Sequence, residues 1–274
     1  METKTRCLLW KKKRKFRALF LGLLALVLAA APPLEVNAQT DRAAVTNALT
    51  KSVEEARKAG VPDTTVITLL SLGYENGVEP ASMAELVRIT GEIRKKGLPL
   101  EPFVDKIAEG VAKRVPAASI ENLLNQKQQD YQFAQSITVA YLKKHGIRQQ
   151  PTSGDLSAIA ESLYSGMTRQ DLTLTMERAP AVPLFSLKRV IDVQASLKQA
   201  GFDPKLSDRI ISTALERNFF ERQRRGFVRA ILAAKRKGIS DLEITEAALT
   251  TMRNGGTVGS FCSLIGVSSS EIGN

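Results

Sequence analysis

The sequence predicts an all-α fold made of helical-hairpin repeats, an α-solenoid-like arrangement with about two helices per 37 residues, in two related halves. Three observations support this prediction. A short phrase of basic or polar residues, a glycine and a large apolar residue recurs along the chain. Between these phrases the apolar residues are spaced as on one face of a helix. No stretch shows the sustained alternation that β-strands require.

The first 38 residues have the three parts of a secretory signal peptide. A basic run, Lys11 to Arg17, precedes the apolar stretch from Ala18 to Ala31, and Val36-Asn37-Ala38 resembles a cleavage site. The apolar stretch has 14 residues, fewer than the ~20 that cross a bilayer as a helix. We expect a Sec-type signal peptide over 1–38, cleaved after Ala38, and a periplasmic or extracellular protein. The alternative is an uncleaved leader that anchors the chain to the inner membrane.

After the leader, the recurring phrase marks the ends of helices. Cations in the last turn complement the helix dipole, and the glycine that follows accepts a left-handed conformation. Gly60 and Gly97 are 37 residues apart, as are Gly201 and Gly238, which indicates a repeat of two helices and an internal duplication. Further glycines at the expected ends or breaks are Gly77, Gly146, Gly166 and Gly255.

Capping residues indicate where helices begin. Ser82 with Glu85 and Ser240 with Glu243 have the S-x-x-E pattern of a capping box, and Thr168 with Asp171 is a weaker form of it. The segment from Pro116 to His145 is predicted to be one long helix that spans the two halves.

These signals divide the chain into five parts. They are the signal peptide over 1–38, an N-terminal repeat half over 39–145, a linker over 146–155, a C-terminal repeat half over 156–254 and a flexible tail over 255–274. The linker is rich in Gln, Pro, Ser and Gly, and the tail in Gly and Ser.

The charge of the chain lies largely in its leader. The formal net charge is +11, but residues 1–38 hold eight Lys and Arg against two Glu, so the rest carries only +5. We therefore expect no specific nucleic-acid partner. Cys262 is the single cysteine after the leader, which excludes an intramolecular disulfide there. We expect an unpaired thiol in the tail, with an intermolecular disulfide through Cys262 as the alternative.

Few residues are candidates for catalysis, and we expect no metal or cofactor. The single histidine, His145, precedes a helix-ending glycine and is interpreted as a cation at a helix C-terminus. A glycan hydrolase needs only two carboxylates that flank the scissile bond. Glu75 and Glu79, near a predicted helix end, are the pair to test for such an activity.

Residues 153–160 read Ser-Gly-Asp-Leu-Ser-Ala-Ile-Ala and are followed by Tyr164, Gly166-Met167-Thr168 and Leu172. This short segment resembles the core of a LysM peptidoglycan-binding module. The resemblance implies a peptidoglycan ligand and strands on both sides of the helical segment. The chain departs from the family because no strand pattern precedes Ser153 and none follows Leu172.

The predicted helix from Phe219 to Lys237 is strongly basic. At 100° per residue, one of its faces carries four arginines and another carries apolar residues. We call the first of these the basic face; it consists of Arg222, Arg225, Arg229 and Arg236. The apolar face consists of Phe220, Phe227, Val228, Ile231 and Leu232.

Taken together, these patterns predict an exported, non-catalytic binding or scaffold protein of a bacterial cell envelope. The expected partner is a protein or an envelope polymer. One alternative is an envelope glycan or peptidoglycan hydrolase, or a peptidoglycan binder. Another is a protein that binds anionic surfaces, membrane or glycan, through the basic face.

Overall fold

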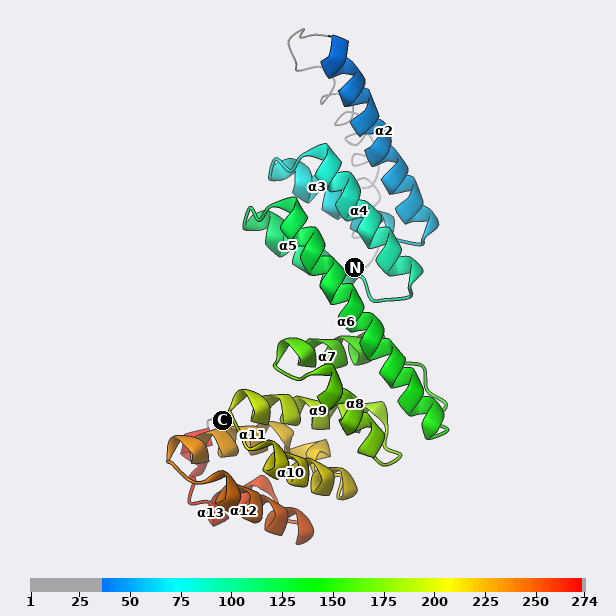
Figure 1. Cartoon of the computed structure of the whole chain (residues 1–274). Coiled ribbons are helices and arrows are strands. Elements are labelled where there is room, and N and C mark those ends of the chain that lie inside the picture. The colour runs from blue at the N-terminus through cyan, green and yellow to red at the C-terminus, as the bar shows by residue number, and fades with distance from the viewer. Residues whose placement is uncertain (1–35, 273–274) are drawn as a thin grey trace, which may run out of the picture. The chain divides into compact units, whose positions relative to one another are not determined.

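The structure, a computed structural model, describes residues 36–272, with side-chain surroundings for all of these except residues 36–43, 221–225 and 269. Within residues 36–272 every regular element is a helix (Figure 1), which confirms the all-α class. The predicted signal peptide lies outside the described residues, apart from Val36-Asn37-Ala38 at the start of the first helix.

The chain divides into two compact units, residues 1–47 and residues 48–274. Helix α2 (Val36–Lys58) begins in the first unit and ends in the second. The second unit continues with α3 (Asp63–Glu75), α4 (Pro80–Lys95), α5 (Glu101–Ala112), α6 (Ala117–Lys144), α7 (Ser153–Tyr164), α8 (Arg169–Arg178), α9 (Leu184–Gln199), α10 (Pro204–Glu216), α11 (Phe220–Arg236), α12 (Asp241–Arg253), α13 (Val258–Leu264) and α14 (Ser269–Ile272).

Helices end where the recurring phrase predicts. Gly60, with φ of 84°, and Gly97, with φ of 69°, have left-handed backbones. The residue after each glycine donates its N–H to a carbonyl five positions earlier, as in Val61 to Ala56 at 3.0 Å. This is the hydrogen bond of a Schellman motif. The same left-handed conformation occurs at Gly77, Gly146, Gly166, Gly201, Gly238, Gly255 and Gly266, and at the non-glycine residues Arg114 and Asn218.

Two of the three predicted capping boxes are confirmed. Thr168 caps α8 and Ser240 caps α12, each with reciprocal hydrogen bonds to the residue three positions later. The box predicted at Ser82 is wrong, because α4 begins two residues earlier at Pro80, after the extended residue Glu79. Proline is well suited to the first helical turn, since its missing N–H has no partner to lose there.

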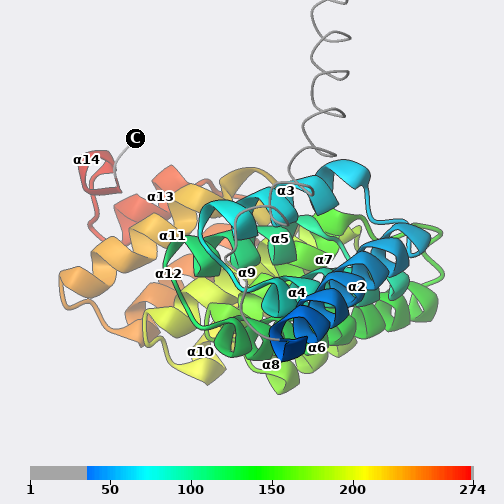
Figure 2. The same cartoon turned by 90° about the horizontal axis from the view of Figure 1, so that it is seen from above.

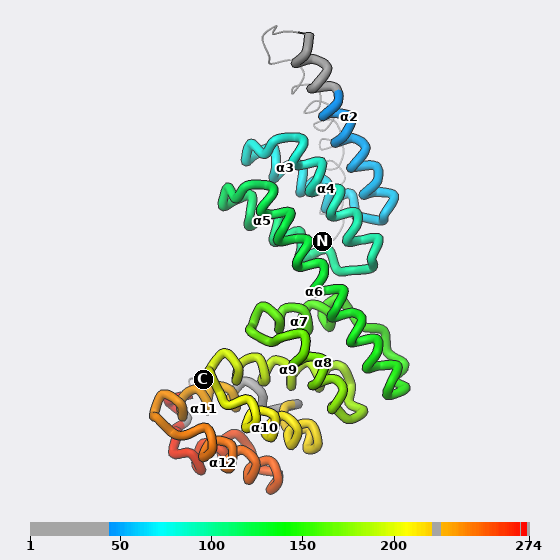
Figure 3. Tube along the Cα trace, in the orientation of Figure 1, coloured from blue at the N-terminus to red at the C-terminus, as the bar shows by residue number. Residues whose placement is uncertain are grey.

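The apolar faces of the helices in the second unit form one buried core. Alternate helices contact each other in this unit: α3 with α5, α4 with α6, α7 with α9, α9 with α11 and α10 with α12. The contact between α9 and α11 can be followed in the view from above, where the two helices lie side by side (Figure 2). Helix α6 has the predicted length and contacts α4 and α5 as well as α7 and α8; its trace is continuous in Figure 3.

The predicted linker over 146–155 is shorter than expected. Helix α7 begins at Ser153, and Thr152 and Asp155 form a capping box at its start. Asp155 is buried. The last three residues of the predicted linker therefore belong to a packed helix, since the polar residues that suggested a linker are capping residues.

The prediction of a flexible tail over 255–274 is wrong for residues 258–272. After the cap at Thr257, Val258, Phe261 and Cys262 lie on the buried side of α13, and Ile265 and Val267 are also buried. The apolar residues at 258, 261, 262 and 265 have helical spacing. The glycines and serines around them hide this short pattern.

Candidate functional site

The basic face lies on α11, which forms the predicted helix. Phe220, Phe227 and Ile231 are buried, as predicted for the apolar face, whereas Val228 and Leu232 are half-buried. Arg229 and Arg236 are exposed. The side chains of Arg222 and Arg225 lie outside those that the structure describes. The face as a binding site remains a prediction.

Helix α9 packs beside α11 and adds an aromatic residue and a cation near the start of α11. Phe185 is 52% exposed. The Arg189 guanidinium lies 3.8 Å from the centre of the Phe185 ring, and its Nη1 donates to the carbonyl of Phe220 at 3.3 Å. The guanidinium is therefore held by a ring of its own helix, α9, and by the backbone of α11.

Phe185 and Arg189 were not predicted as site residues from the sequence. Their spacing of four residues places them on one face of a predicted helix, and this signal could have paired them. The contact with Phe220 could not be found in this way, because it depends on how α9 packs against α11.

Ion pairs join the helices of another surface, formed by α8, α10 and α12. Arg178 of α8 pairs with Asp208 of α10 at 3.3 Å, and Arg209 of α10 pairs with Glu246 of α12 at 2.8 Å. Lys198 at the end of α9 pairs with Asp171 of α8. Cations and carboxylates on this surface neutralise each other within the protein.

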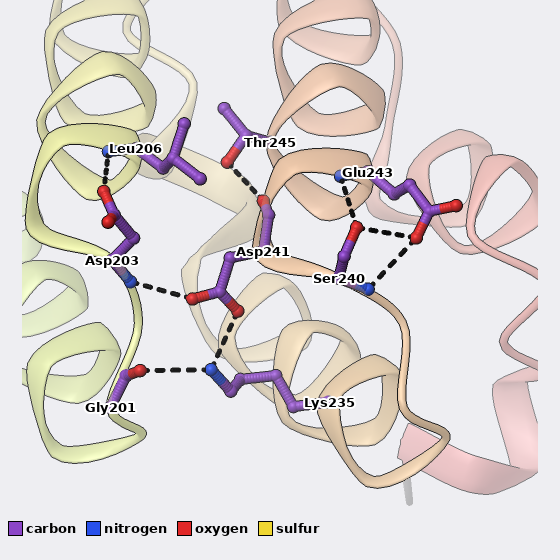
Figure 4. Close-up of polar contacts among 8 residues, drawn as sticks. All are labelled: Gly201, Asp203, Leu206, Lys235, Ser240, Asp241, Glu243 and Thr245. Atoms are coloured by element: carbon purple, nitrogen blue, oxygen red, sulfur yellow. Dashed lines mark hydrogen bonds and ion pairs between the residues drawn. The ribbon is translucent and has the colours of Figure 1, made fainter.

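A polar network links the starts of α10 and α12 to the end of α11 (Figure 4). Lys235 donates to Asp241 at 2.8 Å and to the carbonyl of Gly201 at 3.2 Å. The other carboxylate oxygen of Asp241 accepts the N–H of Asp203 at 2.8 Å. The side chain of Asp203 accepts the N–H of Leu206 at 3.0 Å. Both of these contacts of Lys235 are made within the protein. Lys235 therefore does not contribute to the basic face.

A buried carboxylate joins α7 to α9. Asp155 pairs with Lys188 at 2.5 Å and accepts hydrogen bonds from the N–H and hydroxyl of Thr152 at 2.9 and 2.8 Å. Burial acts to raise the pKa of Asp155, but the ion pair with Lys188 and the hydrogen bonds from Thr152 outweigh it and leave this pKa below its usual value of 3.8.

The lowered pKa of Asp155 predicts a stability change in acid. A carboxylate with a folded-state pKa below its unfolded value stabilises the protein above the unfolded pKa, and this contribution is lost as the pH falls through the folded pKa. We expect Asp155→Asn to reduce the free energy of unfolding by about 1–2 kcal/mol at pH 7 and by much less near pH 2. Urea titrations at the two pH values measure the difference.

Asp105→Asn is the matched control for this experiment, since Asp105 is exposed on α5. Its effect should stay within about 0.5 kcal/mol at both pH values. A cost of Asp155→Asn that is the same at pH 7 and pH 2 would show that the ionised form of Asp155 contributes no stability.

A second group of charged and aromatic side chains lies where α6 meets α7 and α8. We call it the Lys127 cluster; it consists of Lys127, Asp130, Tyr131, Glu161, Tyr164 and Arg169. The ammonium of Lys127 lies 2.6 Å from Oε1 of Glu161, which also accepts the Tyr131 hydroxyl at 3.2 Å. Arg169 of α8 pairs with Asp130 of α6 at 2.9 Å.

Lys127 is enclosed by this cluster. Its side chain is only 7% exposed, and its ammonium lies 5.2 Å from the centre of the Tyr131 ring and 5.1 Å from that of Tyr164. Burial, together with nearby carboxylates, raises the pKa of both tyrosines. The cluster holds α6, α7 and α8 together through charges as well as apolar packing.

The other sequence candidates lie apart from these two groups. Glu75 is the last residue of α3 and Glu79 precedes α4; both are exposed, and a hydrolase that uses them remains a prediction. His145 follows the last residue of α6, and its ring lies 4.7 Å from that of Tyr141. Nε2 of His145 is buried and has no hydrogen-bond partner among the described residues.

Cys262 is buried in α13, and burial raises the pKa of its thiol. The thiol was predicted to lie in a flexible tail, and this location is wrong because Cys262 is buried in a packed helix. An intermolecular disulfide at this position would require α13 to leave the core.

The segment that resembles a LysM module forms α7, a turn at Gly166 and α8. The flanking strands that the resemblance implies do not occur between residues 36 and 272. The capping boxes at Thr152 and Thr168 account for the Asp and Thr of the motif as helix-starting residues.

Among the described residues, no three His, Cys, Asp or Glu side chains come together in a way that could hold a metal ion. No helix in this part of the chain combines the length and the apolar character that a bilayer span requires. The chain matches no family model, no curated protein and no solved structure.

Proposed function

We propose that the protein is an exported helical-repeat protein of a bacterial cell envelope that binds a partner and has no chemistry of its own. One observation carries this proposal: pairs of left-handed helix ends lie 37 residues apart in each half, while alternate helices pack together. This combination is typical of stacked helical hairpins, which present extended surfaces to partners.

The left-handed residues support the repeat in both halves. Gly60 and Gly97 are 37 residues apart, and so are Gly77 and Arg114. In the second half the same spacing separates Gly201 from Gly238 and Asn218 from Gly255. Arg114 and Asn218 stand where glycine is otherwise used, so the backbone conformation is kept even where the residue type is not.

Glycines in helix interiors support the same period. A Cβ on Gly73 would clash with Sδ of Met83, and a Cβ on Gly110 would lie 2.8 Å from Ile120. In both cases the contact is with a residue ten positions later, and the two glycines are 37 residues apart. Successive hairpins thus use the same close approach between a helix and the one that follows it.

The proposed duplication relates the halves by a shift of 141 residues, from Gly60 to Gly201. Under this shift Arg94 corresponds to Lys235. Arg94 donates to the carbonyl of Gly60 at 3.2 Å, and Lys235 donates to that of Gly201 at 3.2 Å. A cation at the end of one hairpin therefore binds the turn of the preceding hairpin in both halves.

Export is tested by expressing the chain with its own leader in a bacterial host. We expect the protein in the periplasmic fraction with Gln39 as its first residue, determined by mass spectrometry of the intact chain. Replacing Leu23 and Leu24 by arginine interrupts the apolar stretch and should keep the protein in the cytoplasm. An intact leader in the membrane fraction would support the anchored alternative, and cytoplasmic wild-type protein would contradict export.

A further inference from the structure

The surface formed by α9 and α11 combines an exposed aromatic ring with positive charge. Arg189 of α9 is held by the Phe185 ring and by the backbone carbonyl of Phe220. Helix α11 contains one glutamate and, besides Lys235, which pairs with Asp241, five cationic residues.

Under the proposed shift of 141 residues, α11 corresponds to α4 of the first half. Helix α4 has three cationic residues against two glutamates, so it is much less basic than α11. The two glutamates of α4, Glu85 and Glu92, correspond to Gly226 and Ala233 of α11. The repeat itself therefore does not require a helix of this charge.

From these observations we propose that the exposed side of α9 and α11 binds an acidic protein segment, with Phe185 and Arg189 as its anchor. The proposal rests on the binding function proposed above and names the class of partner. Arginine and large aromatic residues are the side chains that most often dominate the energy of protein interfaces. A guanidinium already held in place loses little conformational freedom when a carboxylate binds it.

The chemistry of the anchor favours a peptide over a lipid surface. The planar fork of an arginine matches a carboxylate with two parallel hydrogen bonds, and an apolar neighbour on the peptide can cover the exposed Phe185 ring. The Phe185 ring lies beside the Arg189 guanidinium, so one short peptide segment can contact both with a carboxylate and an apolar side chain.

The test uses a fluorescein-labelled peptide of glutamate and leucine and the chain purified after expression with its own leader. We expect fluorescence anisotropy to show binding that weakens about tenfold with Arg189→Gln and with Phe185→Ala. Arg178→Gln is the matched control, since Arg178 is an exposed arginine on α8, and it should leave binding unchanged. Circular dichroism melts check that each variant is folded.

Three results would overturn the proposal. They are equal weakening by Arg178→Gln and Arg189→Gln, binding of vesicles that contain phosphatidylglycerol without binding of the peptide, and no binding of either. None of these results tests the predicted signal peptide, so the export experiment above is independent of them. A photo-crosslinker can be placed at Phe185 or at Val139, an exposed residue of α6. If the chain with the crosslinker at Val139 captures an envelope partner and the chain with it at Phe185 does not, the scaffold function stands and this surface is rejected.

Discussion

Phe261→Ala should reduce the free energy of unfolding by about 3–5 kcal/mol, the range for truncating a fully buried phenylalanine. Phe261 has no exposed surface, and its ring lies 4.9 Å from that of Phe227. The Phe227 ring in turn lies 5.5 Å from Phe219 and 5.3 Å from Phe220. Removing Phe261 opens a cavity at the edge of this aromatic group and loosens α13 against α11.

Leu264→Ala is the matched control, because Leu264 belongs to the same short helix but is 56% exposed. Its effect should stay within about 0.5 kcal/mol. The only tryptophan, Trp10, lies in the leader, so urea unfolding is followed by circular dichroism. Equal stabilities of the two variants would mean that residues 258–272 form the loose tail that their composition suggests.

The helix ends were the most predictable part of the fold. A glycine after a basic turn fixes the local backbone through its own conformational freedom, and the capping boxes at Thr168 and Ser240 act within three residues. Such signals need no knowledge of the rest of the chain. Ser82 shows their limit, because a proline two residues earlier begins the helix first.

Helix α13 and the Lys127 cluster were not predicted, for different reasons. In α13 a short apolar pattern stands among glycines and serines, and composition was given more weight than spacing. Lys127 and Glu161 are 34 residues apart and belong to different helices. No local pattern relates them, since their contact depends on how α7 returns along α6.

The basic face was partly predictable. Helical periodicity placed the buried Phe227 and the exposed Arg229 on different sides of α11, and the structure has them so. Helical periodicity describes α11 alone. The contact between Arg189 and Phe220, which makes α9 part of the same surface, depends on how the two helices pack.

The second large effect is expected from Glu161→Ala, which removes the carboxylate from a buried ammonium. Lys127 is 7% exposed and Glu161 is 49% exposed. Without Glu161, the ammonium keeps the faces of Tyr131 and Tyr164 but loses its anionic partner. Removing one partner of a fully buried pair costs about 3–5 kcal/mol. Because water reaches half of Glu161 and screens the pair, we expect a loss of about 2–3 kcal/mol.

Lys127→Met should lower the free energy of unfolding by less than about 1 kcal/mol. The two partners of this ion pair therefore differ in the effect of their removal. Methionine fills the space of the lysine stem with an apolar chain, and the remaining Glu161 carboxylate can turn toward water. The double variant should be close to Lys127→Met alone, because it buries no unpaired charge. Urea unfolding of the three variants measures these differences. Equal losses in the two single variants would contradict the argument, since they would place the energy in the ion pair itself and not in the burial of the ammonium.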